Sequence, residues 1–403
     1  MTTTLHQSVA LQGKWPRSAE LVIGMLGHLK GGSVNLHLPD GSSQLIGDAH
    51  LVANLRVHDW GMFDAVFTRG SIGFGESFMA GEWETDHLAD LLTLLAQNRE
   101  SLSRAIHGDA LRLIFHRLWH ALRANTKKGS RRNIEAHYDL GNDFYRLWLD
   151  ETMTYSAACY ATPDTPLAEA QREKYRRILR ELDARPGQRI LEVGCGWGGF
   201  AEVACLEFGC RVHGITLSPS QLAWARQRAE QGGFSSKVIL DLCDYRDMEG
   251  KFDHVVSIEM IEAVGEKFWP TYFRKLHDCV LPGGKVVIQG ISIANDLFAH
   301  YRRDVDFIQR YIFPGGMLFS PEVLQREGTR AGLKLVSDTP FGLDYARTLA
   351  EWMQRFNAVR AEVLAQGFDE RFIRMWQFYL AYCEAGFRAG STNVHHFALV
   401  RAS

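Results

Sequence analysis

Apolar runs and amphipathic stretches alternate through the second half of the chain. Short apolar runs such as Ile190–Val193 have the length of a buried strand, and the longer stretches between them carry one apolar face, as helices do. Strands are expected at 190–193, 211–216, 237–241, 253–260, 285–293, 333–337 and 394–401, and helices at 166–182, 200–208, 219–231 and 268–279. This alternation predicts an α/β fold with a doubly wound parallel sheet, whose ligand lies outside the carboxyl ends of the strands.

The first hundred residues follow another pattern, and we expect them to form a small accessory α+β domain (1–100). Two alternating stretches, Ser33–Leu38 and Leu51–Val57, predict strands, and a Pro-Asp-Gly-Ser turn follows the first of them. Helices are expected at 20–29, 60–69 and 86–97, and a segment rich in Gly and aromatic residues, Gly70–Glu84, lies between the last two. This domain offers no catalytic constellation, so its expected role is structural or lipid-facing.

A linker (101–136) is expected to join this domain to a catalytic domain (137–403). It begins with an amphipathic helix, 101–124, and ends in a basic cluster formed by Lys127, Lys128, Arg131 and Arg132. The cluster is either a solvated linker or a contact for anionic lipid head groups, which would be worth about 1 kcal/mol per charge near the surface. Charge alone favours the linker. The next segment, 137–160, is polar and aromatic by turns and is expected to close over a bound cofactor.

Composition narrows the function classes. The net charge of −2 and the pI of about 6.8 give no sign of a nucleic-acid partner. The seven cysteines are scattered without a C-x-x-C pair, which argues against a disulfide framework and a zinc site. We see neither a secretory signal nor an apolar run long enough to span a membrane. The expected location is therefore the cytoplasm.

The clearest chemical signal is the stretch at 189–201, R-I-L-E-V-G-C-G-W-G-G-F-A. Glycines between a strand and a helix let a ligand approach the backbone, and the helix directs its free N–H groups at that ligand. A plain tight turn and a dinucleotide site are the two competing interpretations. A dinucleotide site needs a carboxylate at the end of the second strand, which ends here in Thr216. The carboxylate is instead Glu192, two residues before Gly194. Its charge suits the ammonium and sulfonium of S-adenosylmethionine (SAM), so we predict a Rossmann-like SAM methyltransferase sheet.

Several further motifs occur in order along the chain. They are H-Y-D-L-G-N-D (137–143), M-T-Y-S (153–156), L-E-V-G-C-G-W-G-G (191–199), G-I-T-L-S-P-S-Q (214–221), E-A-V-G (262–265), R-Y-I-F-P-G-G (310–316) and D-Y-A-R-T-L (344–349). With them, the sequence resembles the family of cyclopropane fatty acid synthases and mycolic acid cyclopropane synthases over about residues 115–401. The resemblance implies methyl transfer from SAM to the cis double bond of a phospholipid acyl chain. It also implies removal of a proton from that methyl, which closes a cyclopropane ring.

The resemblance also implies roles for individual residues. The SAM contacts that it implies, together with Glu192, are Tyr155, Ser156, Gly194, Gly196, Thr216, Gln221, Asp244 and Tyr245. The family uses a bound bicarbonate for the proton, and the residues that would hold it here are Glu262, Tyr345, Gln289 and the backbone amides of Ala157 and Ile291. A peripheral position at the inner face of the membrane follows from such a substrate, and a homodimer is left open.

Two positions depart from the family pattern. Ala157 stands where better-known members have cysteine, but it can supply the same backbone amide. Gln289 stands where they have histidine, and a glutamine amide can donate a hydrogen bond but carries neither a proton nor a charge. Methyl transfer is therefore the firmer expectation. A methyl branch without a ring, a methyltransferase for a soluble small molecule, and a SAM-fold protein without turnover stay as alternatives.

Two aromatic stretches, 295–314 and 369–387, are expected to be helical. Their apolar stripes, which include Phe307 and Trp376, are more typical of core than of a binding site. In an enzyme that acts on acyl chains, part of them could line the channel for the chain.

Overall fold

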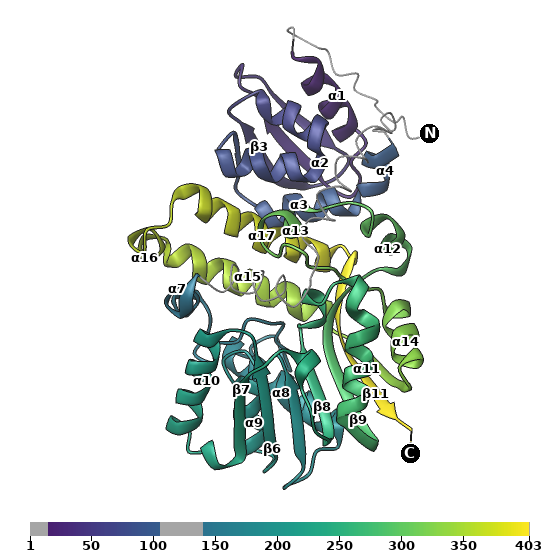
Figure 1. The fold of residues 1–403 in the computed structure, drawn as a ribbon. Helices are drawn as coiled ribbons and strands as arrows, with labels where there is room; N and C mark the ends of the chain where they lie inside the picture. Colours follow the sequence, from purple (N-terminus) through teal and green to yellow (C-terminus); the bar gives the residue numbers. More distant parts are fainter. Residues whose placement is uncertain (1–14, 105–139, 403) are drawn as a thin grey trace. The chain divides into compact units, whose positions relative to one another are not determined.

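The computed structural model describes residues 15–104 and 140–402. The chain divides into two compact units, residues 1–107 and 108–403 (Figure 1). The basic cluster and most of the predicted linker 101–136 lie outside the described residues, as do the first residues of segment 137–160.

The N-terminal unit contains a four-stranded sheet in the order β2-β1-β3-β4. β1 pairs in parallel with β3 and antiparallel with β2, and β3 pairs antiparallel with β4. Its strands are β1 (Ser33–His37), β2 (Ser43–Gly47), β3 (Leu51–Val57) and β4 (Trp83–Thr85), and its helices are α1 (Arg17–Leu26), α2 (Gly61–Ala80), α3 (Leu88–Gln97) and α4 (Arg99–Arg104). The predicted strands and helices are present, and β2 and β4 are additional.

The helix predicted at 60–69 continues into the Gly-rich segment that follows it. Helical backbone continues to Ala80, interrupted at Gly70, whose φ of 57° and ψ of −134° kink the helix. Gly73 faces the first half of α2 so closely that a Cβ there would lie 1.9 Å from the carbonyl oxygen of Ala65. The glycines therefore allow two helical segments to fold against each other rather than ending the helix.

The C-terminal unit is built on a seven-stranded sheet in the order β10-β11-β9-β8-β5-β6-β7. The five strands from β9 to β7 run in parallel. β11 pairs antiparallel with β9, and β10 pairs antiparallel with β11 at the edge of the sheet. The strands are β5 (Arg189–Val193), β6 (Arg211–Thr216), β7 (Val238–Leu242), β8 (Phe252–Ile258), β9 (Val280–Ile293), β10 (Leu333–Pro340) and β11 (Thr392–Arg401). The predicted doubly wound α/β sheet is confirmed.

Helices cover both faces of this sheet because its buried strands alternate their side chains between two cores. Ile190 packs with residues of α8 and α9, whereas the next residue, Leu191, packs with residues of α11 and α14 on the opposite face. The helices of this layer are α8 (Leu167–Leu182), α9 (Gly199–Leu206), α10 (Pro219–Gln231), α11 (Trp269–Cys279) and α14 (Pro321–Arg330), and short 3-10 turns occupy Ser235–Lys237, Tyr245–Asp247, Ile261–Ala263 and Glu266–Phe268.

Further helices stand beyond the carboxyl ends of the parallel strands (Figure 1). They are α7 (Gly141–Trp148), α12 (Asn295–Tyr301), α13 (Phe307–Tyr311), α15 (Gly342–Ala358), α16 (Arg360–Ala365) and α17 (Glu370–Arg388). The predicted single helical stretch 295–314 is thus two short helices. Within residues 15–104 and 140–402, no helix combines the length and the apolarity that crossing a membrane requires.

An aromatic cluster joins α7, α15 and α17. Trp148 contacts Trp352 and Trp376 with ring centroids 5.8 and 5.5 Å apart, and all three side chains are almost fully buried. The ring of Tyr155 lies against the same cluster, 5.3 Å from Trp352. The cluster therefore fixes segment 153–157 over the sheet.

Candidate active site

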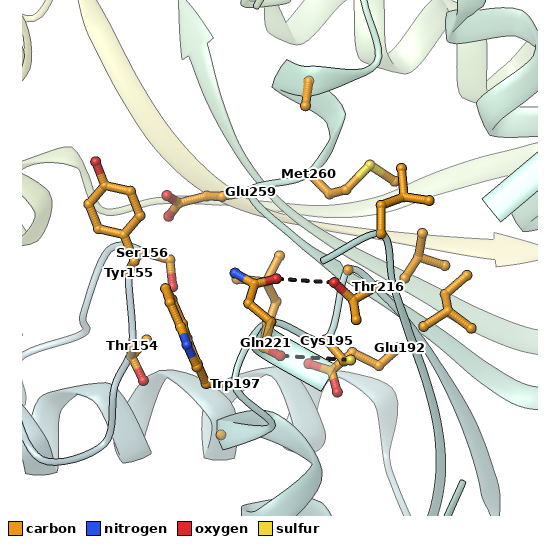
Figure 2. Close-up of a pocket in the computed structure, with 18 of the residues that line it drawn as sticks. Thr154, Tyr155, Ser156, Glu192, Cys195, Trp197, Thr216, Gln221, Glu259 and Met260 are labelled. Carbon is orange, nitrogen blue, oxygen red and sulfur yellow. Dashed lines mark hydrogen bonds between the residues drawn. The ribbon is translucent and has the colours of Figure 1, made fainter. Parts of the chain in front are cut away.

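A pocket opens at the carboxyl ends of β5, β6 and β8, where a doubly wound sheet is expected to bind its ligand (Figure 2). Its cavity volume is about 160 Å³. The predicted cofactor residues in its wall are Tyr155, Ser156, Glu192, Gly194, Gly196, Thr216, Gln221 and Tyr245. Their contact with SAM stays a prediction.

The glycine turn forms the floor of the pocket. Gly194, Gly196 and Gly198 have φ values of 88°, 51° and 84°, a region that favours glycine. A Cβ at Gly194 would lie 3.1 Å from the Cγ of Met260. α9 begins directly after the turn, so its free N–H groups and positive dipole end face this side of the pocket.

Glu192 brings a carboxylate into the pocket wall. Its side chain is 2% exposed, and Oε2 has no hydrogen-bond partner among the described residues. Burial raises the pKa of this carboxyl well above its ordinary value, and the cation of Lys174 acts in the opposite direction. Lys174 is itself buried and donates to Ser156 Oγ at 2.6 Å, and burial lowers its pKa to about 8. An unpartnered buried oxygen at a pocket wall suits a ligand that donates hydrogen bonds.

The second strand ends in a polar pair. Thr216 Oγ1 donates to Gln221 Oε1 at 3.1 Å, a bond drawn in Figure 2, and both residues are buried. Ser218 fixes Gln221 there because its hydroxyl accepts from the Gln221 N–H and caps α10. On the opposite wall, the Tyr155 hydroxyl lies 2.7 Å from that of Tyr379.

Asp244 is not among the residues that line the pocket, and its place near the adenine of SAM stays a prediction. Its two carboxylate oxygens accept hydrogen bonds from the Arg246 guanidinium, at 2.8 Å from Nε and 2.5 Å from Nη2. Oδ1 also accepts from the Arg246 N–H and caps the short 3-10 turn. The next residue, Tyr245, does line the pocket.

The residues assigned to bicarbonate gather around another carboxylate, that of Glu259. Oε1 accepts from the Ala157 amide at 2.8 Å and from Gln289 Nε2 at 2.7 Å. Oε2 accepts from the Tyr345 hydroxyl at 2.9 Å. Glu259 follows β8 directly and belongs to the wall of the pocket, where its side chain extends from beside Met260 toward Tyr155 (Figure 2).

Glu262 and Ile291 form a second pair beside this cluster. Glu262 Oε1 accepts from the Ile291 N–H at 2.5 Å, and its buried Oε2 has no hydrogen-bond partner among the described residues. Burial, reinforced by the charge of Glu259, raises the pKa of Glu262 to about 8. This carboxyl therefore carries a proton at neutral pH.

His396 on β11 orients the amide of Gln289. Its Nε2 lies 2.9 Å from Gln289 Oε1, which only accepts, so the proton sits on Nε2. Burial, with the cations of Lys174 and Arg177, lowers the pKa of His396 to about 3 and keeps the ring neutral. The amide nitrogen of Gln289 is thereby turned toward Glu259 and toward the Ala157 carbonyl, 3.3 Å away.

The two predicted ligands differ in how they fit these residues. SAM fits, since the glycine turn is open to a ligand and Glu192 presents an unpartnered oxygen. Bicarbonate does not fit, since Ala157, Gln289 and Tyr345 already bond Glu259, and the Ile291 amide bonds Glu262. A negative charge on Glu259 would also repel a second anion.

Sequence reasoning missed Glu259, Lys174, Trp197 and His396. Trp197 belongs to the glycine motif, whose spacing assigns it no role. In the structure it lines the pocket and donates to Asn142 Oδ1 at 2.8 Å. For Glu259 a signal was present, because an acidic residue directly after a buried parallel strand stands at the ligand-binding edge of the sheet. Lys174 and His396 are recognisable only from their partners.

Comparisons with known proteins identify the family of the chain. The model of the mycolic acid cyclopropane synthetase family matches residues 125–397. A tuberculostearic acid methyltransferase of Mycobacterium tuberculosis is 44% identical over 341 residues, which cover 82% of this chain and 79% of the relative. The cyclopropane-fatty-acyl-phospholipid synthase of Escherichia coli K12 is 37% identical, with coverage of 84% and 85%. A mycolic acid cyclopropane synthase solved with S-adenosylhomocysteine (SAH) and CTAB has a TM-score of 0.63 at 29% identity, with coverage of 67% and 97%.

Proposed function

The chain belongs to the mycolic acid cyclopropane synthetase family of SAM-dependent methyltransferases, and from this we propose that it methylates the cis double bond of an unsaturated phospholipid acyl chain. The observation that carries the proposal is that the SAM pocket and the polar cluster around Glu259 adjoin each other. The pocket predicted for SAM and the polar cluster around Glu259 share one wall. A methyl donor and a group that accepts a proton therefore have places beside each other.

In this proposal, the walls of the pocket hold and orient SAM, which supplies an electrophilic methyl group. Glu192 receives hydrogen-bond donors of the cofactor, and the glycine turn lets it approach the backbone. Thr216 and Gln221 present polar groups to its ribose and adenine side. Because an alkene is a weak nucleophile, this alignment is the main contribution that the protein can make to methyl transfer.

Aromatic side chains suit the charge that develops on the substrate. Addition of a methyl group to an alkene leaves a carbocation, which is stabilised by aromatic faces and by the exclusion of water. Tyr155 lines the pocket, and its ring is held by Trp148 and Trp352 at centroid distances of 5.7 and 5.3 Å. Tyr345 packs behind it, 6.1 Å from Trp352.

The substrate also calls for a position at the membrane surface, and we include peripheral association at the inner face in the proposal. A phospholipid acyl chain has to be reached from the bilayer, and the basic residues between 127 and 132 suit anionic head groups. Flotation with anionic vesicles measures this association. The full chain is expected to float, and a variant with those four basic residues changed to glutamine is expected to float less. If neither protein floats, the membrane part of the proposal is refuted.

The reaction is tested by mass spectrometry of phospholipid fatty acids from cells that express the protein and receive methyl-labelled methionine. The expected result is a labelled gain of CH₂ on a monounsaturated chain. Cells that express the Glu192→Gln variant are the control. Absence of label from every lipid would refute the proposal in favour of a small-molecule methyltransferase or a protein without turnover.

A methyl branch without a ring is the second candidate product. It is favoured by the relatives, since the one that is 44% identical is named a methyltransferase, and the cyclopropane synthase of Escherichia coli is 37% identical. Catalytic hydrogenation of the labelled lipid separates the two products. A ring keeps its mass under conditions that hydrogenate alkenes, whereas a branched chain with a remaining double bond gains two hydrogens.

A further inference from the structure

We propose that Glu259 is the base of this enzyme, and that its carboxylate stands in the place that the family resemblance assigns to a bicarbonate ion. The inference rests on the proposed function and names the group that accepts the proton. It begins from a disagreement between the bicarbonate ligands that the resemblance implies and the hydrogen bonds that these residues make. Of the five residues expected to hold bicarbonate, Ala157, Gln289 and Tyr345 donate to Glu259, and Ile291 donates to the fifth, Glu262.

The surroundings of Glu259 are those of an anion site. The N–H groups of Ala157 and Gln289 can only donate, and the Tyr345 hydroxyl donates here as well. Three donors at 2.7 to 2.9 Å around one carboxylate form the kind of cradle that holds a small oxyanion. The chain fills this cradle with its own side chain.

The amide of Gln289 is held in one orientation. Its nitrogen donates to Glu259 and to the Ala157 carbonyl, and its oxygen accepts from His396. A flipped amide would place its oxygen against two acceptors, the Glu259 carboxylate and the Ala157 carbonyl. Gln289 therefore requires an acceptor on the pocket side, and Glu259 provides it.

The backbone at Glu259 gives an independent sign of function. Its φ of 48° lies in the left-handed region, which is uncommon for a residue other than glycine. Strained backbone of this kind persists where the surroundings hold it, and it concentrates at active sites. Here the Glu259 N–H donates to the Gln289 carbonyl at 2.8 Å, so both the backbone and the side chain of Glu259 are hydrogen-bonded to Gln289.

Charge around Glu259 is balanced for proton transfer. Burial raises the pKa of its carboxyl, while Lys174 and the three hydrogen bonds act against that rise. Because its pKa is raised, the Glu259 carboxylate is a stronger base than an exposed one, which suits a general base. Glu262, protonated beside it, adds no second negative charge there.

The proposed step balances in atoms and electrons. The π electrons of the alkene form a bond to the methyl carbon, and the electron pair of the broken carbon–sulfur bond stays on sulfur as SAH. A C–H bond of the transferred methyl then breaks, and its proton moves to a Glu259 carboxylate oxygen. The C–H electron pair closes the third ring bond or, after a hydride shift, forms a new double bond. Either product needs the same base.

The first test measures bicarbonate binding by NMR with ¹³C-labelled bicarbonate, with SAH present. The wild type is expected to show no saturable binding. Glu259→Gly empties the cradle, accepts the backbone angle and is expected to bind bicarbonate. Glu249→Gln, at an exposed acidic position, is the matched control. SAH binding by every variant confirms that the pocket is folded. Saturable binding to the wild type would overturn the proposal, and so would failure of the folded glycine variant to bind.

The second test measures turnover on monounsaturated phospholipid vesicles in buffer freed of bicarbonate. The wild type is expected to be independent of added bicarbonate. Glu259→Gln keeps the shape without the base and is expected to lose about 100-fold or more in kcat, with SAM affinity preserved and no rescue by bicarbonate. Glu259→Gly is expected to be slow until bicarbonate is added.

The outcomes separate this inference from the proposed function. Wild-type turnover that requires bicarbonate, or a glutamine variant within about threefold of wild type, would overturn the role of Glu259. If the wild type labels no lipid under any condition, the proposed function fails, and Glu259 has no lipid proton to accept. The NMR result still decides whether Glu259 occupies the anion site.

Discussion

Replacement of Glu192 by glutamine isolates the contribution of one buried charge to cofactor binding. In the free protein, Oε2 of Glu192 has no hydrogen-bond partner among the described residues, so a bound cation would supply its donor. A hydrogen bond to a charged group contributes about 1.5–3 kcal/mol. Since 1.4 kcal/mol is a factor of ten, we expect Glu192→Gln to raise the Kd for SAM by roughly tenfold to a hundredfold.

The same substitution is expected to change the pH dependence of binding. Burial raises the pKa of Glu192 in the free protein, whereas a bound cation favours the carboxylate. SAM binding therefore releases a proton, and its affinity rises with pH until the free protein is itself ionised. The glutamine variant has no such proton to release.

Isothermal titration calorimetry measures both effects. Titrations in buffers of different ionisation enthalpy give the number of protons released, and Glu230→Gln on the exposed side of α10 is the control. Thermal unfolding checks the fold, and the neutral Glu192→Gln variant should unfold at a temperature no lower than the wild type does. A Kd within twofold of wild type, or a proton release that persists in the variant, would refute this reasoning.

Three further predictions concern other parts of the site. Asp244→Asn loosens the turn that holds Arg246 but is expected to raise the Kd for SAM less than Glu192→Gln does, as calorimetry can show. Trp352→Ala leaves a cavity in the aromatic cluster and is expected to cost about 3–5 kcal/mol in urea denaturation. The pKa of Glu262 is raised from 4.5 to about 8, so between these values the folded state keeps a proton that the unfolded state has lost. Stability should therefore fall as pH rises through this window, and denaturation of Glu262→Gln at several pH values should show a smaller fall.

The sequence was most informative where the site is contiguous. Glu192, Gly194 and Gly196 belong to one strand and turn, so their spacing predicts their common place in the pocket. A carboxylate near a strand end, such as that of Asp244, suits a ligand, but in the structure it pairs with Arg246 two residues later. The predicted end of the first long helix at residue 69 was wrong, since α2 continues past Gly73, which packs closely against Ala65 despite the low helix propensity of glycine.

Glu259 shows where such prediction ends. Its three partners come from a loop, from β9 and from α15, at separations of 102, 30 and 86 residues. No local sequence pattern predicts contacts between residues this far apart in the chain. The substitution of histidine by Gln289 is visible in the sequence, but its meaning depends on the carboxylate that faces it.

The place of β11 in the sheet determines when, during translation, the sheet and the site can be completed. Although it is the last of the seven strands to be translated, it lies between β9 and β10 and carries His396, which orients Gln289. A nascent chain that ends after β10 can build the glycine turn but leaves two strand edges open and the base without its support. Such edges invite pairing with other chains. The emerging polypeptide therefore reaches catalytic competence late, and its need for protection from aggregation is greatest just before the final strand leaves the ribosome.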